Sequence, residues 1–293
     1  DSRRGGVYVH GPGVTMTTLR PLSVLLTLAL ACGPSAGGGD DDDVTGDAGP
    51  DSASGGPDAP DTGANAAVYA HTASTLFRVH PLTYAIVRVG DFGWPSGSDQ
   101  MTDIAIDKDG VMIGVSYGRV YRVDPDTAAC TLLSSNLAGM FNGLSFVPAS
   151  LASGVEGADV LVGTRNTDGV VFRIDPMTGA ATAIGDMGAG YVSSGDIVAV
   201  TGFGMVATVP TGTLGPDQLV RLAPVTFAAT PIGGNTGFDR LWGVGYWGTR
   251  VFGFSERGDL TVIDRATGAG TLVAGGGETW WGAAVTTAAP IVD

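Results

Sequence analysis

The chain has 293 residues, a formal net charge of −14, 48 glycines and 16 prolines. Only 15 lysines and arginines stand against 29 acidic residues, and no basic patch is present, which excludes a nucleic-acid partner. The two cysteines, Cys32 and Cys130, are too few for a disulfide framework. Short apolar runs separated by Gly, Pro, Asp and Thr indicate an all-β protein with ample chain for a core.

The first 32 residues predict a leader. Residues 1–15 carry no pattern, and Met16 is the predicted start, so 1–15 is interpreted as a non-native or misannotated extension. The apolar run at 22–31 is too short to span a bilayer, which needs about 20 residues. Its position after Arg20 is typical of a secretory signal, so residues 16–32 are predicted to be a signal peptide.

The end of this leader resembles the lipobox of bacterial lipoproteins. Residues 28–32 read Leu-Ala-Leu-Ala-Cys, with Ala29 where that family usually has Leu. The resemblance implies a lipidated Cys32, a membrane partner and a place in the cell envelope; an incidental Cys32 after an ordinary cleaved signal is the alternative. Because Gly33 stands where Asp would retain the protein at the inner membrane, the outer membrane is favoured.

Residues 33–65 are predicted to be a disordered acidic linker. Eight acidic residues lie between Asp40 and Asp61 with no basic residue among them, and the segment is rich in Gly, Pro, Ser and Ala. Such a composition cannot bury enough apolar surface to fold. We expect an extended tether that holds the following domain away from the membrane.

From residue 66 a strand–turn–strand pattern recurs five times. The hairpins cover 76–89, 120–133, 171–184, 220–232 and 260–273. Their turn positions (Pro81, Pro125, Pro176, Pro224 and Arg265) are spaced by 44, 51, 48 and 41 residues. A spacing of roughly 40–50 residues is that of four-stranded propeller blades. The arginines before the turns are expected to pair with turn aspartates such as Asp124 and Asp175.

The other two strands of each period can also be placed. Innermost strands are predicted at 101–107, 141–147, 194–200, 241–246 and 279–285, and second strands at 67–71, 111–116, 160–164, 205–209 and 251–255. The domain therefore begins with a second strand and ends with an innermost one, which can complete the first blade and close the ring. We predict a five-bladed β-propeller over residues 66–290, and a monomer.

The hairpins resemble those of secreted bacterial propellers, which read Leu-Tyr-Arg-Ile-Asp-Pro-x-Thr-Gly. Residues 171–182 follow this pattern almost throughout. The resemblance covers about three quarters of the chain and implies the fold, while it leaves activity unassigned.

The loops that lead into the innermost strands carry aromatic and polar residues, which favours a ligand site at one mouth of the channel. The predicted ligand-binding residues are Trp94, Asn142, Tyr191, Asp239, Arg240, Trp242, Trp280 and Trp281. The expected function is a binding or scaffold module for a protein or glycan ligand. The alternative for these aromatics is that they only plug the channel.

Catalysis has weaker support in the sequence. The three histidines provide neither a hydrolytic triad nor a metal cluster, so no catalytic residue or cofactor is assigned. An alternative function is a carbohydrate-active enzyme that uses Asp103, Asp196 and Glu278 in the central funnel. A structural cation held by Asp103, Asn142 and Asp196 is a further hypothesis.

Overall fold

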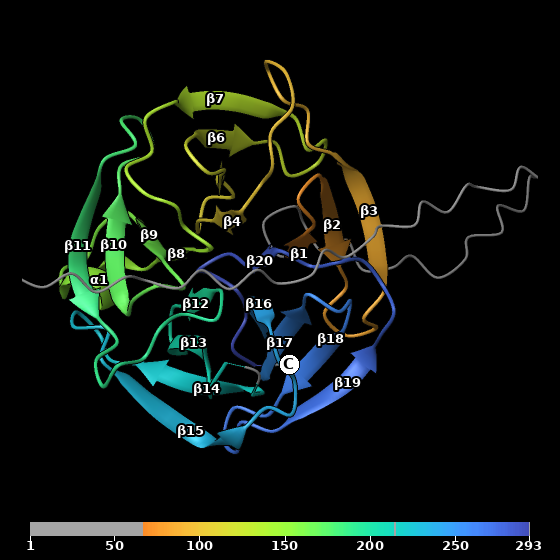
Figure 1. Ribbon diagram of the computed structural model, residues 1–293, viewed down its shortest axis with the longest axis vertical. Coiled ribbons are helices and arrows are strands. Elements are labelled where there is room, and N and C mark those ends of the chain that lie inside the picture. Colours follow the sequence, from red (N-terminus) through yellow and green to blue (C-terminus); the bar gives the residue numbers. More distant parts are fainter. Residues whose placement is uncertain (1–66, 214, 293) are drawn as a thin grey trace, which may run out of the picture. The chain divides into compact units, whose positions relative to one another are not determined.

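The computed structural model describes residues 67–213 and 215–292, and these form a five-bladed β-propeller (Figure 1). Each blade is a four-stranded antiparallel sheet. We number the blades by their second strands: blade 1 contains β20-β1-β2-β3, and blades 2 to 5 contain β4–β7, β8–β11, β12–β15 and β16–β19. The predicted fold class and blade count are confirmed.

The strands fall where the repeat predicts them. The innermost strands are β4 (Asp103–Ile106), β8 (Gly143–Val147), β12 (Ile197–Val200), β16 (Leu241–Trp247) and β20 (Gly282–Ala284). The second strands are β1 (Val68–His71), β5 (Met112–Val115), β9 (Val160–Thr164), β13 (Gly204–Pro210) and β17 (Arg250–Ser255). The third strands are β2 (Thr75–Val79), β6 (Val120–Val123), β10 (Val170–Ile174), β14 (Asp217–Leu222) and β18 (Leu260–Ile263). The outermost strands are β3 (Ile86–Asp91), β7 (Cys130–Ser134), β11 (Ala181–Asp186), β15 (Ala229–Asn235) and β19 (Gly270–Ala274).

The ring closes through the two ends of the domain. Strand β20 pairs with β1 in antiparallel register, with Tyr69 opposite Ala284 and His71 opposite Gly282. Blade 1 is thus built from both ends of the described chain, as predicted. This pairing removes the open sheet edges that an unclosed ring would present.

The outer hairpins turn through side-chain capping rather than ion pairs. The Asp124 carboxylate accepts backbone N–H bonds from Asp126 and Thr127, and Asp175 and Asp264 repeat this arrangement. In blade 1, His80 stands at the turn position and its Nδ1 takes the same role, accepting the N–H groups of Leu82 and Thr83.

The predicted pairing of strand arginines with these aspartates is wrong. Asp124 and Asp175 satisfy turn N–H groups within their own loops, which is the usual use of Asp in turns. Arg78 reaches instead to Asp126 of the neighbouring blade at 2.7 Å.

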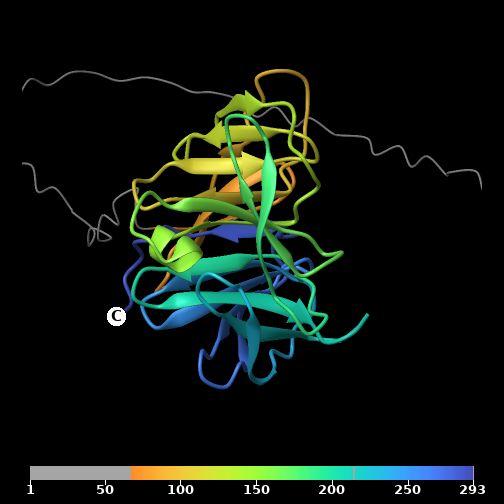
Figure 2. The same cartoon turned by 90° about the vertical axis from the view of Figure 1, so that its left-hand side faces the viewer.

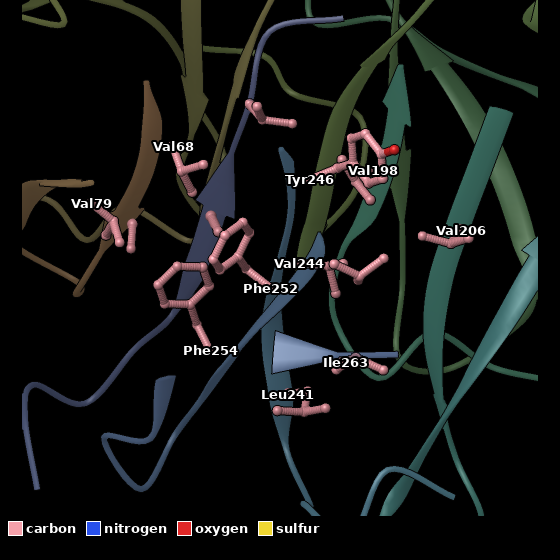
Figure 3. Packing of buried hydrophobic residues seen from close by; sticks show 14 of the residues in the cluster. Val68, Val79, Val198, Val206, Leu241, Val244, Tyr246, Phe252, Phe254 and Ile263 are labelled. Carbon is pink, nitrogen blue, oxygen red and sulfur yellow. The ribbon is translucent and has the colours of Figure 1, made fainter. Parts of the chain in front are cut away.

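The core lies between the faces of adjacent blades. Between blades 5 and 1, Phe252 and Phe254 of β17 pack with Val68 and Val79, and Val198 and Val206 of blade 4 join the same cluster (Figure 3). Phe77 of β2 meets Trp280 edge to face, with 5.3 Å between ring centroids. Because each blade is covered on both faces, its inner strands are almost continuously apolar.

The face of the ring where the innermost strands end is closed by the C-terminal segment, and we call it the closed face. Thr286 Oγ1 donates to the Asp107 carbonyl oxygen, and Thr287 Oγ1 donates to the Asp159 carboxylate. The backbone carbonyl of Pro290 accepts the N–H of Gly248. These contacts reach blades 2, 3 and 5, so the segment crosses the channel end.

One short helix, α1 (Ala149–Ser153), lies at the periphery of the ring, as Figure 1 and Figure 2 show. Among the residues described, no helix has the length and apolar character needed to cross a membrane. The predicted extension, signal peptide and linker (1–15, 16–32 and 33–65) and the lipidated Cys32 lie outside the described residues and stay predictions.

Candidate functional site

The opposite face, where the innermost strands begin, is hollowed, and we call it the open face. It holds a cavity of about 260 Å³, the mouth pocket. Its lining residues come from the strands and loops of blades 1, 2, 3 and 5: Thr102, Tyr117, Met140, Phe141, Asn142, Asn166, Trp242 and Trp281. Antiparallel strands bring the loops between second and third strands to this same face, which is why Tyr117 and Asn166 join the pocket.

Two tryptophans form one wall of the mouth pocket. Trp242 and Trp281 stand edge to face, with ring centroids 6.3 Å apart and planes at 89°. The backbone N–H of Trp281 donates to the His71 carbonyl oxygen at 2.8 Å, which holds its loop against β1. Both side chains are half-buried, so each retains aromatic surface toward the cavity.

The polar groups of the mouth pocket carry no formal charge. Asn142 and Asn166 supply carboxamides, and Thr102 supplies a hydroxyl that donates to the Val115 carbonyl oxygen. Asn142 Nδ2 makes a long bond of 3.4 Å to the Ser194 carbonyl oxygen, and its Oδ1 has no partner among the described residues. The Asn142 carboxamide is therefore weakly held at the pocket wall.

A second cavity of about 250 Å³, the rim hollow, adjoins the mouth pocket, because Asn166 and Trp242 line both. Its carboxylates are Asp217 and Asp239. Asp217 accepts bonds from Ser194 Oγ at 2.6 Å and from the Leu241 N–H at 2.7 Å, and burial raises its pKa.

The other two charged side chains that line the rim hollow, Asp239 and Arg240, are in ion pairs. Asp239 bonds Arg257 at 2.8 Å, and Arg240 is paired with Glu256. Arg240 has φ +52°, a left-handed conformation that is uncommon for a residue with a side chain. Its carbonyl oxygen accepts the N–H groups of Trp242 and Glu256, each at 3.0 Å, which stabilises this turn.

Beneath the open face, two buried carboxyls occupy the channel axis. Asp103 and Asp196 have no exposed surface, and they form what we call the axial pair. Asp103 accepts the N–H groups of Ile104 and Leu144, and Asp196 Oδ2 accepts those of Val244 and Ala283 at 3.3 Å. Inner-strand edges have no further strand to pair with, so the axial pair satisfies N–H groups that face the channel.

Burial raises the pKa of both carboxyls, and for Asp103 the neighbouring Asp196 charge adds to this effect. His71 Nε2 lies 3.4 Å from Asp103 Oδ1, while His71 Nδ1 bonds the Thr72 carbonyl oxygen and must carry the proton there. Burial lowers the His71 pKa to about 4, so the imidazole is neutral at pH 7. Two buried like charges repel strongly, so this arrangement favours one proton shared by the two carboxyls over two ionised carboxylates.

The predicted ligand-binding residues divide between the two cavities and the core. Trp242, Trp281 and Asn142 meet in the mouth pocket, and Asp239 and Arg240 line the rim hollow. The remaining three, Trp94, Tyr191 and Trp280, lie elsewhere.

Trp94 and Tyr191 are half-buried packing residues: Trp94 packs against Phe92 and Tyr121, and Tyr191 against the core of blades 3 and 4. The prediction for Trp280 needs correction. Its side chain is fully buried against Phe77 and Phe254, so no ligand can reach it without opening the core.

The proposed catalytic trio is not brought into one cavity. Asp103 and Asp196 are adjacent but wholly buried, whereas Glu278 is exposed on the loop before β20 and lines neither the mouth pocket nor the rim hollow. Within residues 67–213 and 215–292, no three His, Cys, Asp or Glu side chains are grouped so as to hold a metal ion.

Sequence reasoning missed His71, Thr102, Tyr117, Met140 and Asn166. A usable signal existed for Tyr117 and Asn166, because a second strand always ends on the face where the next innermost strand begins. His71 gave no such signal, since its approach to Asp103 requires the closed ring.

Comparison with known proteins shows the fold alone. No protein-family model and no curated protein matches the chain. A chain of the nidogen/laminin complex aligns over 74% of this chain and 97% of its own length, with a TM-score of 0.51 and 9% identity. A protein described in work on the de novo evolutionary emergence of a symmetrical protein aligns over 78% of this chain and 99% of its own length, with a TM-score of 0.48 and 16% identity. BamB from Moraxella catarrhalis aligns over 69% of this chain and 70% of its own length, with a TM-score of 0.34 and 15% identity.

These observations define a class of protein: a five-bladed β-propeller with an axis closed by buried carboxyls and two adjoining small cavities on its open face.

Proposed function

We propose that this propeller is a ligand-binding module of the cell envelope, anchored by lipid at Cys32 and reaching its ligand through the open face. The observation that carries the proposal is the mouth pocket, where an edge-to-face tryptophan pair meets neutral carboxamides in one concavity. Aromatic walls with a few converging polar groups are typical of binding sites. The lipobox and the acidic linker support the anchoring.

Binding rather than catalysis fits the groups that a ligand could touch. The mouth pocket is lined by aromatic, thioether, amide and hydroxyl side chains, and none of these is an ionised acid or base. The buried axial pair is occupied with inner-strand N–H groups and has no exposed surface. These features favour a protein or glycan ligand held without chemical change.

The proposal is tested with the full chain in detergent against arrays of glycans and peptides. Trp242→Ala and Trp281→Ala are expected to lower affinity for any ligand found by about thirtyfold each, as aromatic residues at the centre of a site usually do. Val87→Ala is the matched control, because Val87 is 61% exposed on β3, outside both cavities. Unchanged binding by both tryptophan variants would overturn the proposal.

Anchoring has a separate test in cells. The wild-type protein is expected in the membrane fraction, and the Cys32→Ala protein in the soluble fraction. A Cys32→Ala protein that remains with membranes would refute lipidation at this residue.

A further inference from the structure

We infer that the mouth pocket and the rim hollow act as two adjacent subsites for a neutral oligosaccharide, with Trp242 between two successive sugar units. This inference rests on the proposed function and adds the ligand class. It starts from the junction of the two cavities, since the Trp242 side chain and Asn166 line both.

The cavity sizes favour a chain of small repeated units. The volumes are about 260 and 250 Å³, each below the roughly 300–1,000 Å³ of cavities that hold a drug-sized molecule. A single larger ligand would need one continuous cavity. Two nearly equal cavities that share Trp242 and Asn166 instead fit two units of one polymer.

The mouth pocket suits the amphipathic surface of a sugar ring. A pyranose has C–H groups on its faces and hydroxyls at its edge, so it can pack on an aromatic wall while its edge forms hydrogen bonds. Trp242 and Trp281 supply the wall, and the exposed Asn166 carboxamide of the same lining can donate to one hydroxyl and accept from another.

The charged side chains that are accessible at the rim hollow are hydrogen-bonding groups of both kinds, and each is balanced by an ion-pair partner, whereas the third charged residue, Asp217, is buried and bonded to Ser194 and the Leu241 N–H. Asp239 can accept from hydroxyls and Arg240 can donate to them, while Arg257 and Glu256 balance their charges. A charged ligand would leave one of these ion pairs broken. The site therefore favours a neutral chain.

The Arg240 turn links the two subsites. Its left-handed backbone, held by bonds from the backbone N–H groups of Trp242 and Glu256, places Asp239 and Arg240 three and two residues before Trp242 on one tight loop. Uncommon backbone conformations persist where surrounding bonds enforce them, and they gather at binding sites.

A protein partner is less well served by this face. The exposed large apolar residues that line either cavity are Tyr117 at 52% and Met140 at 67%, and the others among the described residues lie outside both cavities. A stable protein interface needs a continuous buried centre within about 1,200–2,000 Å². Two side chains around a small hollow do not provide it.

The test is calorimetric titration of the full chain in detergent with neutral oligosaccharides of one to six units, built from glucose, mannose, xylose or N-acetylglucosamine. Affinity for the matching sugar is expected to rise at least about tenfold from one unit to two and then to level off, since a tenfold gain is a modest contribution for a second subsite. Trp242→Ala should weaken one-unit and two-unit ligands alike. The Asp239→Asn/Arg240→Gln protein should weaken only the longer ligands, and Val87→Ala should change neither.

Four outcomes would overturn the inference. Equal affinity for one and two units, or binding of a peptide with no oligosaccharide bound, would remove the two-subsite glycan reading while the mouth pocket remained a binding site. A double variant that weakens the single unit as strongly as the longer chains would show that the rim hollow acts only through the fold. Absence of any glycan or peptide ligand would defeat the proposed function as well.

Discussion

Replacing Asp196 by Asn is predicted to make the stability of the propeller less sensitive to pH. In the wild type, burial raises both pKa values, so the folded axial pair holds a shared proton to a higher pH than the unfolded chain does. An Asn at 196 keeps an oxygen for the Val244 and Ala283 N–H groups, and its NH₂ group can donate to Asp103 in place of the shared proton.

The sign of the pH effect follows from these directions. A folded pKa above the unfolded one contributes stability that is complete below the unfolded value, about 3.9, and is lost as pH rises through the folded value. The wild type should therefore lose about 1.4 kcal/mol per pH unit relative to Asp196→Asn while the pair holds its extra proton.

His71 changes the stability with pH in the opposite direction to the axial pair. Its pKa is lowered to about 4 by burial, so its contribution is complete above about 6.5 and falls by about 3 kcal/mol as pH drops toward 4. Because His71 is present in both proteins, its effect largely cancels in the difference between them. Above pH 6.5 the axial pair alone governs that difference.

The assay is urea unfolding, followed by tryptophan fluorescence, at several pH values from about 5 to about 9. The free energy of unfolding of Asp196→Asn minus that of the wild type should increase with pH. Asp196→Ala leaves the Val244 and Ala283 N–H groups without acceptors and should cost about 2–6 kcal/mol at every pH. A difference between Asp196→Asn and wild type that stays constant with pH would refute the shared proton.

Other substitutions probe the packing and the turns. Trp280→Ala should lower the free energy of unfolding in urea by about 3–5 kcal/mol. Trp280→Phe should lower it much less, because the buried Nε1–H has no acceptor among the described residues and no hydrogen bond is lost. Equal losses for the two variants would contradict this reasoning. Gly179→Ala should cost more than about 1–2 kcal/mol by thermal or urea unfolding, since φ is +75° and a Cβ would lie 2.5 Å from the Asn136 carbonyl oxygen. Burial raises the Cys130 pKa to about 12, so in the Cys32→Ala protein this thiol should react with an aromatic disulfide reagent at about pH 8 only after denaturant is added. Arg78→Ala should change the free energy of unfolding by less than about 1 kcal/mol, because its partner Asp126 is exposed and its bond to the Tyr69 hydroxyl is long, at 3.3 Å; a larger loss would show that these contacts stabilise the fold more than their exposure and length imply.

The repeat made the fold predictable. Each period carries an apolar inner run, a second apolar run and an outer hairpin, and this order can be read without tertiary information. The turn residues Asp124 and Asp175 marked the right positions, although their bonds go to turn N–H groups and not to arginines. A carboxylate in a turn has backbone N–H donors two or three residues away. It bonds these donors in preference to an arginine, whose flexible side chain would lose more conformational entropy in an ion pair.

The site was predictable only in part. Loop position identified Trp242, Trp281 and Asn142, because every inner strand begins on the open face. The same rule selected Trp280, which differs from Trp281 by one residue and points into the core. Adjacent residues of an extended segment point to opposite sides, so which of two neighbours faces the ligand depends on the exact register.

The sequence by itself determined the five-bladed β-propeller, its closure by the last strand, and the face on which a ligand site should be sought. These follow from local patterns that repeat along the chain. The axial pair, the approach of His71 to Asp103 and the junction of the two cavities at Trp242 were decided only by the tertiary structure. They depend on contacts between side chains of different blades near the axis. These residues are far apart along the chain, and no local sequence pattern indicates which of them come into contact.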